Sequence, residues 1–449
     1  MTAVLPDRDV TVSASEVPAH EVPAVLSRSI LADGFDFVLD TEQSRGSYLV
    51  DARTGDRYLD MFTFFASSAL GDEPSGADGP PGVARRTGRH RGQQAEQLRY
   101  LHRHHGPVRR YVHQGARRPG TAAPVLHRRG GALAVENALK VAFDWKSRRN
   151  ESRGGLAAPG SRVLHLRGAF HGRSGYTMSL TNTDPNKVAR FPKFDWPRID
   201  APYLRPGVDP VALEAESLRQ ARAAFEAYPD DIACFIAEPI QARAVIGISA
   251  PEFFAAMRAL CDEFDALLIF DEVQTGCGMT GTAWAYQQLG VRPDVVAFGK
   301  KTQVCGLMAG GRVDDVPDNV FAVSSRINST WGWQPHRYGP VPAHPGGHRS
   351  RRPDAQRKGA RRPPAGPLAR RGIRVPPALV RDPRGRGLMC AFSMPSGAAR
   401  DELVNRLWDR HVIMLPSGVD SVRFRPALTV SRDELDAAVD AVRAVLNTL

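Results

Sequence analysis

Two short apolar runs separated by a helical stretch constrain the fold of this chain more than any other feature. Residues 231–240 (DIACFIAEPI) and 266–273 (ALLIFDEV) are almost uninterrupted apolar segments that end in acidic residues. Between them, residues 251–265 (PEFFAAMRALCDEFD) repeat apolar side chains at helical spacing. Strands joined by a crossover helix lie parallel in one sheet, and such strands are buried on both faces. The sequence therefore predicts an α/β fold with a large, mostly parallel sheet.

Other segments continue this alternation of strands and helices. Residues 162–170 and 295–301 predict strands that end in glycine turns, and residues 130–149 predict a helix with an apolar stripe. Residues 47–65 predict two strands joined by a turn at Thr54 and Gly55. From Ser431 onward the sequence predicts a C-terminal helix, with Glu434 completing a capping box.

The net charge of +12 comes from two stretches that lack any periodicity. Residues 72–130 carry a net charge of +8 and residues 334–374 one of +10, so the remainder is mildly acidic. A nucleic-acid binder that uses these stretches is an alternative, and steep salt-dependent retention on DNA would favour it. Their only aromatic residues are Tyr100, Tyr111 and Tyr338, too few to stack on bases. We therefore expect no nucleic-acid partner.

The five cysteines are widely scattered and show no CxxC spacing. This pattern favours reduced thiols in a cytoplasm over disulfides or a zinc site, and we expect no metal. The sequence has neither a secretory pattern nor an apolar run of about 18 residues, so we expect no membrane partner.

Two polar residues at predicted strand ends carry the functional hypothesis. Asp271 ends one apolar strand and Lys300 follows the next one at a glycine turn, where ligand sites of α/β sheets collect. Either residue alone is ordinary. Together they are what pyridoxal 5′-phosphate requires: a lysine that binds the aldehyde and a carboxylate that keeps the pyridine nitrogen protonated.

A phosphate site and a ring-covering aromatic residue should accompany them. Gly131 and Ala132 open a predicted helix, whose free N–H groups attract an anion. Phe170 follows a strand and is a candidate to stack on the ring, although ordinary core packing explains it equally well. His171 is expected to be packed core rather than a polar ligand.

Six motifs in chain order resemble those of the class III (ω-) aminotransferases. They are RGAFHGRSGYT (167–177), FIAEPIQ (235–241), LLIFDEVQTGCGMTGTAWAYQ (267–287), PDVVAFGKK (293–301), NSTWG (328–332) and VRFRPALTV (422–430). Residues 47–71 and 189–203 are most similar to members of the family that act on the ε-amine of L-lysine. The resemblance covers about three quarters of the chain and implies transfer of that amine to 2-oxoglutarate. Ornithine or 4-aminobutyrate remains the alternative amino donor.

The resemblance implies roles in cofactor binding for specific residues. Lys300 would bind the cofactor and shuttle the proton, Asp271 would face the ring nitrogen, and Gln274 would lie near the ring hydroxyl. Phe170 would stack on the ring. The phosphate turn would be formed by Gly131 and Ala132 and completed by Ser329 and Thr330 of a neighbouring subunit, which implies a homodimer.

Three further residues would bind the substrates. Arg173 resembles the residue that holds the remote carboxylate, and Arg423 the one that binds the α-carboxylate of 2-oxoglutarate. Glu238 would pair with Arg423 while lysine occupies the site, because an unpaired buried guanidinium is costly. A permanent salt bridge between the two is the structural alternative.

The resemblance also implies a fold-type-I architecture, in which segments from both ends of the chain form a small α/β domain. The expected division is a lead-in (1–24), small domain (25–75), large cofactor-binding domain (76–330), basic linker (331–374) and the rest of the small domain (375–449). Residues 72–130, 242–249 and 334–374 depart from the family pattern. We interpret the two basic stretches as translated out of frame, with real insertions or an inactive product as alternatives; resequencing the coding DNA separates these.

Overall fold

The computed structural model of the chain describes most of the segments that follow the family pattern. The described residues are 17–28, 31, 34–72, 125–127, 130–154, 160–204, 207–241, 249–302, 305–323, 326–327 and 379–449. The expectations for nearly all of the two basic stretches, for residues 242–248 and for Ser329 and Thr330 lie outside the described residues. In the described part, no helix is long and apolar enough to cross a membrane.

A seven-stranded sheet forms the centre of the larger part of the molecule. Its strands, in spatial order, are β3 (Val125–His127), β9 (Cys305–Ala309), β8 (Val295–Phe298), β7 (Leu267–Asp271), β6 (Ile232–Ala237), β4 (Arg162–Leu166) and β5 (Arg198–Ile199). Neighbours from β8 to β5 are parallel, whereas β9 runs antiparallel to β8 and β3 antiparallel to β9. The predicted α/β fold with a mostly parallel sheet is confirmed.

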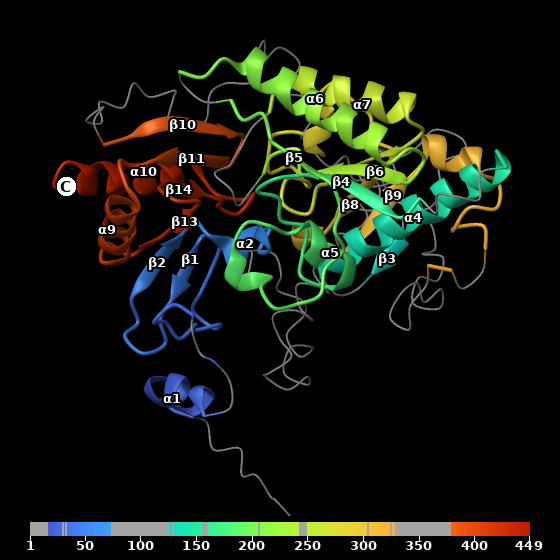
Figure 1. The fold of residues 1–449 in the computed structure, drawn as a ribbon. Helices are drawn as coiled ribbons and strands as arrows, with labels where there is room; N and C mark the ends of the chain where they lie inside the picture. Colours follow the sequence, from blue (N-terminus) through green and yellow to red (C-terminus); the bar gives the residue numbers. More distant parts are fainter. Residues whose placement is uncertain are drawn as a thin grey trace, which may run out of the picture.

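Helices cover both faces of this sheet. One face packs against α4 (Gly131–Ser152) and α5 (Gly175–Leu180), and the other against α6 (Pro210–Ala227) and α7 (Pro251–Glu263), as Figure 1 shows. In β7, alternate side chains enter opposite cores: Ile269 points to the α4 side, and Phe270 to the α7 side. Burial on both faces explains why the central strands β6 and β8 are apolar throughout.

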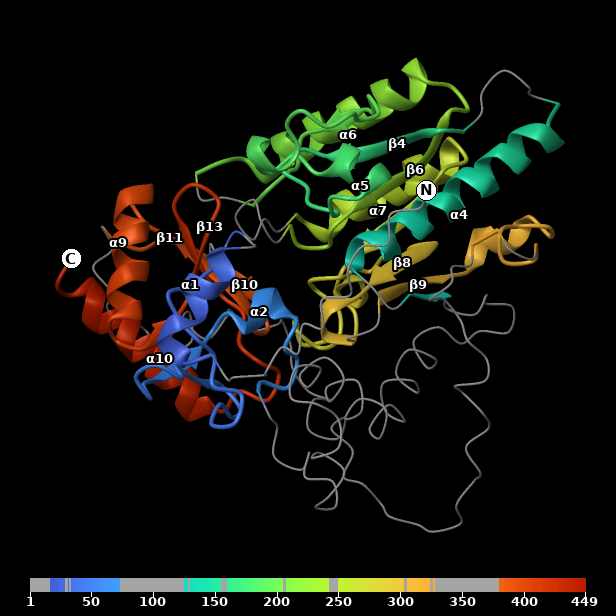
Figure 2. The same ribbon diagram turned by 90° about the horizontal axis from the view of Figure 1, so that it is seen from below.

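Segments from both ends of the described chain form a second core. It contains β1 (Tyr48–Val50), β2 (Arg57–Asp60), β10 (Arg381–Arg386), β11 (Met389–Ser393), β12 (Val412–Ile413), β13 (Leu415–Ser417) and β14 (Ser421–Phe424), with α9 (Gly397–Trp408) and α10 (Arg432–Leu446). The N-terminal and C-terminal segments lie side by side in both views (Figures 1 and 2). The capping box predicted for the C-terminal helix is present between Ser431 and Glu434. The domain boundaries stay a prediction.

The predicted N-terminal hairpin is present but shorter than expected. Strands β1 and β2 pair antiparallel around Gly55, whose φ is 79°. The second strand ends at Asp60, so the expectation of strand as far as residue 65 was wrong. The Asp60 carboxylate accepts hydrogen bonds from the backbone N–H groups of Phe62 and Thr63, both at 2.8 Å, and these bonds turn the chain into α2 (Thr63–Ala66).

The remaining helical segments are short. They are α1 (Val22–Ser27) and the 3₁₀ turns η1 (Ala19–Glu21), η3 (Pro185–Lys187), η4 (Ala285–Gln288), η5 (Lys300–Thr302) and η6 (Gly311–Asp315). Of these, η5 bears on function because it follows β8 at the carboxyl end of the parallel strands.

Candidate active site

Asp271 ends β7 and is held in place by two neighbouring groups. Its Oδ1 accepts a hydrogen bond from the backbone N–H of Val273 at 3.1 Å, and its Oδ2 lies 2.8 Å from Nδ1 of His171. Asp271 and His171 are both almost completely buried. The burial of His171 agrees with the expectation that it is packed core, and its ring also fixes the carboxylate of Asp271.

Lys300 lies at the carboxyl end of the adjacent strand, so the structure brings it and Asp271 together. Asp271 pairs in register with Ala297 of β8, three residues before Lys300. Burial lowers the pKa of Lys300 to about 8, aided by the charges of Arg425 and Arg423 and opposed by those of Asp271 and Glu238. A lowered pKa leaves more of the amine neutral and able to attack a carbonyl group.

The backbone of Lys300 adopts a conformation that is uncommon for a residue with a side chain. Its φ is +55°, in the left-handed region. Such a conformation costs about 1 kcal/mol or more and persists only where the surroundings impose it. It turns the chain sharply out of β8 and directs Lys300 toward the ends of the neighbouring strands.

The N-terminus of α4 lies beside both residues. The helix begins at Gly131 without a side-chain cap, after Gly130 with a φ of 72°. A Cβ added to Gly131 would come within 2.7 Å of Val273, and one added to Gly299 would lie 3.6 Å from the Cα of Gly131. The two glycines therefore let the helix start approach the turns that follow Asp271 and precede Lys300. Uncapped N–H groups at this point fit the phosphate of the expected cofactor.

Gln274 occupies the turn that follows Asp271 and is held at two atoms. Its side-chain Oε1 accepts a hydrogen bond from Nη1 of Arg425 at 3.0 Å, and its backbone oxygen accepts one from Nζ of Lys301 at 2.6 Å. Because Arg425 uses Oε1, the amide nitrogen of Gln274 is the atom left to face a ligand, as a donor. That orientation suits a ring oxygen, in agreement with the expected role.

Glu238 and Arg423 approach the same place from two other strands. Glu238 follows β6, and its Oε1 accepts a hydrogen bond from the backbone N–H of Phe170 at 3.0 Å. Arg423 lies in β14, and both charged side chains are buried. Each influences the pKa of Lys300, which places the two oppositely charged residues around the same amine. Their expected exchange of partners stays a prediction.

Arg173 lies on the loop between β4 and α5 and is exposed. The preceding Gly172, with a φ of 122°, packs closely on α4: a Cβ there would meet that of Ala132 at 2.5 Å. The loop that carries Arg173 is thus anchored at the helix start, and its guanidinium faces solvent where a carboxylate can reach it.

The sequence did not predict three residues that lie around Asp271, Lys300 and Gln274. They are Arg425, Lys301 and His171, the last as the partner of Asp271. The first two carried a usable signal. Arg425 lies two residues beyond Arg423, and alternate residues of an extended segment share a side. Lys301 directly follows Lys300, and a second lysine in an otherwise apolar strand end is unusual.

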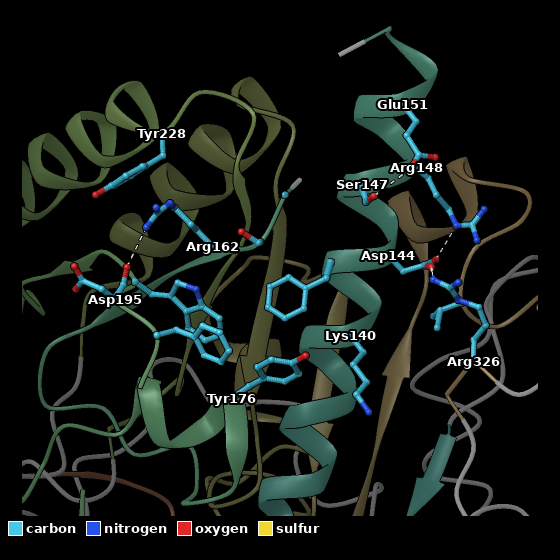
Figure 3. A pocket seen from close by; sticks show the side chains of 16 residues that line it. Lys140, Asp144, Ser147, Arg148, Glu151, Arg162, Tyr176, Asp195, Tyr228 and Arg326 are labelled. Carbon is cyan, nitrogen blue, oxygen red and sulfur yellow. Dashed lines mark hydrogen bonds and ion pairs between the residues drawn. The ribbon is translucent and has the colours of Figure 1, made fainter. Parts of the chain in front are cut away.

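A cavity of about 890 Å³ lies elsewhere in the described part, along the C-terminal half of α4. Figure 3 shows Arg162 bonded to the backbone of Asp195, and Asp144 between Arg148 and Arg326. None of the residues that line this cavity belongs to the predicted site.

The arrangement at the strand ends has the chemistry expected of a pyridoxal phosphate site. A partly neutral amine, a fixed carboxylate, an amide donor and an uncapped helix start converge from β7, β8 and α4. These groups match the aldehyde, ring nitrogen, ring oxygen and phosphate of that cofactor in turn.

Comparisons with known proteins show the family of this chain. The family model described as aminotransferase class-III matches residues 31–338. The chain is 57% identical over 461 aligned residues to the L-lysine-epsilon aminotransferase of Mycobacterium tuberculosis, with 99% of each chain covered. It is 47% identical to the enzyme of the same name from Streptomyces clavuligerus, covering 97% of this chain and 96% of that one. The solved structure of lysine aminotransferase from M. tuberculosis in the internal aldimine form matches with a TM-score of 0.77 and 52% identity, covering 96% of this chain and all of that chain.

Proposed function

The chain belongs to the class-III aminotransferase family, and from this premise we propose that it transfers the ε-amino group of L-lysine to 2-oxoglutarate. Its cofactor is pyridoxal 5′-phosphate, as in that family. The products are glutamate and 2-aminoadipate 6-semialdehyde, which cyclises because its α-amine reaches the aldehyde in a six-membered ring. The observation that carries the proposal is the convergence of Lys300, Asp271 and the start of α4, in a chain so similar to lysine-epsilon aminotransferases.

Each cluster residue then has a defined task. The bound cofactor supplies an electron sink for the carbon that loses its proton. Lys300 would hold the cofactor at its aldehyde carbon and would move the proton at Cε of the substrate, because its amine is partly neutral near pH 8. Asp271, fixed by His171, keeps the ring nitrogen protonated. Phe170 would cover the ring, and Gln274 would donate to its oxygen.

The two arginines divide recognition of the substrate carboxylates. Arg173 is exposed on the loop before α5. It holds the α-carboxylate of the substrate lysine, so that the ε-amine at the other end of the lysine side chain is presented to the cofactor. Arg423 binds the α-carboxylate of 2-oxoglutarate, and Glu238 neutralises it while lysine is present. A bidentate guanidinium suits a carboxylate, and a neutralising partner avoids burying an uncompensated charge.

We also propose that the active enzyme is a homodimer, in which Ser329 and Thr330 of one subunit complete the phosphate site of the other. Sedimentation of the cofactor-loaded protein tests this. A well-folded, loaded monomer would contradict it.

Lysine labelled with ¹⁵N at the ε-position tests the proposed reaction. Label that appears in glutamate supports transfer of the ε-amine, and label that stays in the keto product means that the α-amine was taken. Parallel assays with ornithine and 4-aminobutyrate show whether either is the better amino donor, which would overturn the choice of lysine but not of the family.

A further inference from the structure

A second lysine beside Lys300 is buried in the site, yet the proposed reaction gives it no task. Lys301 is 3% exposed, and burial lowers its pKa to about 7. Burying an amine is unfavourable unless it makes hydrogen bonds. The contacts of this side chain therefore indicate what its burial achieves.

The amine of Lys301 reaches from the turn that carries Lys300 to the turn that follows β7. Its Nζ donates a hydrogen bond to the backbone oxygen of Gln274 at 2.6 Å. This distance lies at the short end of the range for a hydrogen bond between nitrogen and oxygen. Because Lys300 and Lys301 are consecutive in η5, this single bond ties the amine-bearing turn to the position of Gln274.

The turn around Gln274 is fixed from its other side as well. The backbone N–H of Gly276 donates to the backbone oxygen of Glu272 at 2.9 Å, and the Glu272 carboxylate accepts from the backbone N–H of Tyr286 at 2.8 Å and from the hydroxyl of Thr275. These bonds hold the two ends of the turn. The backbone oxygen of Gln274, at its middle, is held by Lys301.

We propose that Lys301 is a positioning residue that places Gln274 against the cofactor ring by holding its backbone oxygen, an inference that rests on the proposed pyridoxal phosphate site. Arg425 orients the side-chain amide of Gln274, and Lys301 sets where the residue stands. Without the bond, the amide donor moves relative to the ring oxygen, and hydrogen-bond strength falls steeply with distance and angle.

Lys146 provides a matched control from the opposite end of the sheet. It is also completely buried, and its Nζ donates to the backbone oxygens of Asp265 at 3.0 Å and Phe264 at 3.3 Å. Neither acceptor belongs to the site. Lys146 also forms an ion pair with Asp230 at 3.6 Å. Lys146→Met and Lys301→Met thus both remove a buried amine bound to backbone oxygens, and only the second change affects Gln274.

The affinity of the cofactor-free protein for pyridoxal phosphate and the absorbance of the bound cofactor are the measurements. We expect Lys301→Met to weaken the affinity about 10-fold, because the displaced Gln274 amide loses its one hydrogen bond to the ring oxygen, and to shift the absorbance maximum. Lys146→Met should lower thermal stability and leave both cofactor measurements as in the unchanged protein. Wild-type affinity and absorbance in Lys301→Met overturn the proposal.

A double-mutant cycle tests whether Lys301 acts through Gln274. In a Gln274→Ala background, Lys301→Met should weaken cofactor affinity by less than about 2-fold, because the amide that it positions is gone. A full, additive loss overturns the proposed route. If Lys301→Met does not fold, Lys301→Gln replaces it: its shorter side chain cannot reach the acceptor, and unchanged affinity in this variant would equally refute the proposal.

These measurements need no amino donor. A failure of the lysine assignment leaves their outcome intact, whereas failure of Lys300 to bind the cofactor at all would remove the premise. The two failures are therefore distinguishable.

Discussion

Asp265, before β7 at one end of the seven-stranded sheet, and Lys300, after β8 at the other end, respond to burial in opposite ways. Before β7, at the amino ends of the strands, Asp265 accepts hydrogen bonds from Arg149 and Arg312 and forms an ion pair with Arg153 at 2.9 Å. Burial alone would raise the pKa of Asp265, but the bond from Arg149 and the nearby positive charges outweigh it, so the pKa is lowered. The charge of Asp265 is therefore stabilised, although burial raises the pKa of Asp294 and lowers that of Lys146 at the same end of the sheet.

At the carboxyl ends, burial prevails. It lowers the pKa of Lys300 to about 8 and that of Lys301 to about 7, and it raises the pKa of Glu272 to about 7. Groups held near their point of ionisation at neutral pH are suited to proton transfer, whereas well-paired ions are not. The comparison indicates that the well-paired Asp265 maintains the fold, whereas Lys300 is suited to the chemistry.

The largest expected effect on activity follows from removing the amine of Lys300. Lys300→Ala eliminates both the covalent attachment and the proton carrier, so we expect turnover to fall by at least about 10⁴-fold. The absorbance of the bound cofactor at roughly 400–430 nm should also disappear. Lys140→Ala, a change at an exposed position on α4, is the control. Retention of the absorbance, for example through Lys301, would refute the assignment of Lys300.

The carboxylate of Asp271 should rank next. Asp271→Asn keeps the size of the side chain but removes the negative charge that favours a protonated ring nitrogen, so we expect a loss in kcat of about 10³-fold with the protein still folded. Single-turnover rates with lysine measure it. A loss of less than tenfold would mean that another group holds the ring nitrogen.

The matching change at the opposite end should affect stability instead. Asp265→Asn leaves the guanidinium groups of Arg149 and Arg312 without their carboxylate, which we expect to cost about 3 kcal/mol of unfolding free energy. Thermal and denaturant unfolding measure the loss, and turnover per folded molecule at low temperature should be unchanged. A large fall in turnover without a change in stability would erase the distinction between the two ends.

The sequence predicted those parts of the site that are marked locally. Asp271 and Lys300 lie where apolar runs end, and a pair of glycines in the sequence predicts the start of α4. Contacts between distant segments were not predictable. His171 and Asp271 are 100 residues apart, and Arg425 and Gln274 are 151 apart. These pairs form only because of the strand order, which a local pattern does not encode.

The same reasoning explains the error at the N-terminal hairpin. The aromatic and β-branched residues after Asp60 have a high propensity for strands, and this propensity alone predicts a strand. Two hydrogen bonds to the buried Asp60 carboxylate instead turn the chain, and Thr63 adopts a φ of 48°. Tertiary contacts of one acidic residue outweigh the propensity of the residues that follow it.

Substitutions of two arginines in the proposed site should affect the two half-reactions differently. Arg423→Ala should spare the lysine half-reaction and weaken the 2-oxoglutarate half about 30-fold, the loss of a charge-assisted hydrogen bond to a carboxylate. Arg173→Ala should weaken both, because lysine and 2-oxoglutarate each present a remote carboxylate. Stopped-flow measurement of each half-reaction decides, and equal losses in both halves for Arg423→Ala would contradict the assigned role.

The smallest expected effect concerns pH and follows from the lowered pKa of Lys300. Only the neutral amine attacks the cofactor aldehyde, so the rate at which cofactor-free protein captures pyridoxal phosphate should rise as pH approaches the folded pKa of about 8 and then level off. Between pH 7 and pH 8 the neutral fraction rises from about one tenth to about one half, a roughly fivefold increase in rate. Arg425→Gln removes a charge that lowers this pKa, so its midpoint should move to higher pH. A rate that keeps rising tenfold per pH unit up to pH 10 would instead mean that Lys300 has the ordinary pKa of an exposed lysine. The contrast between Lys300 and Asp265 would then not hold.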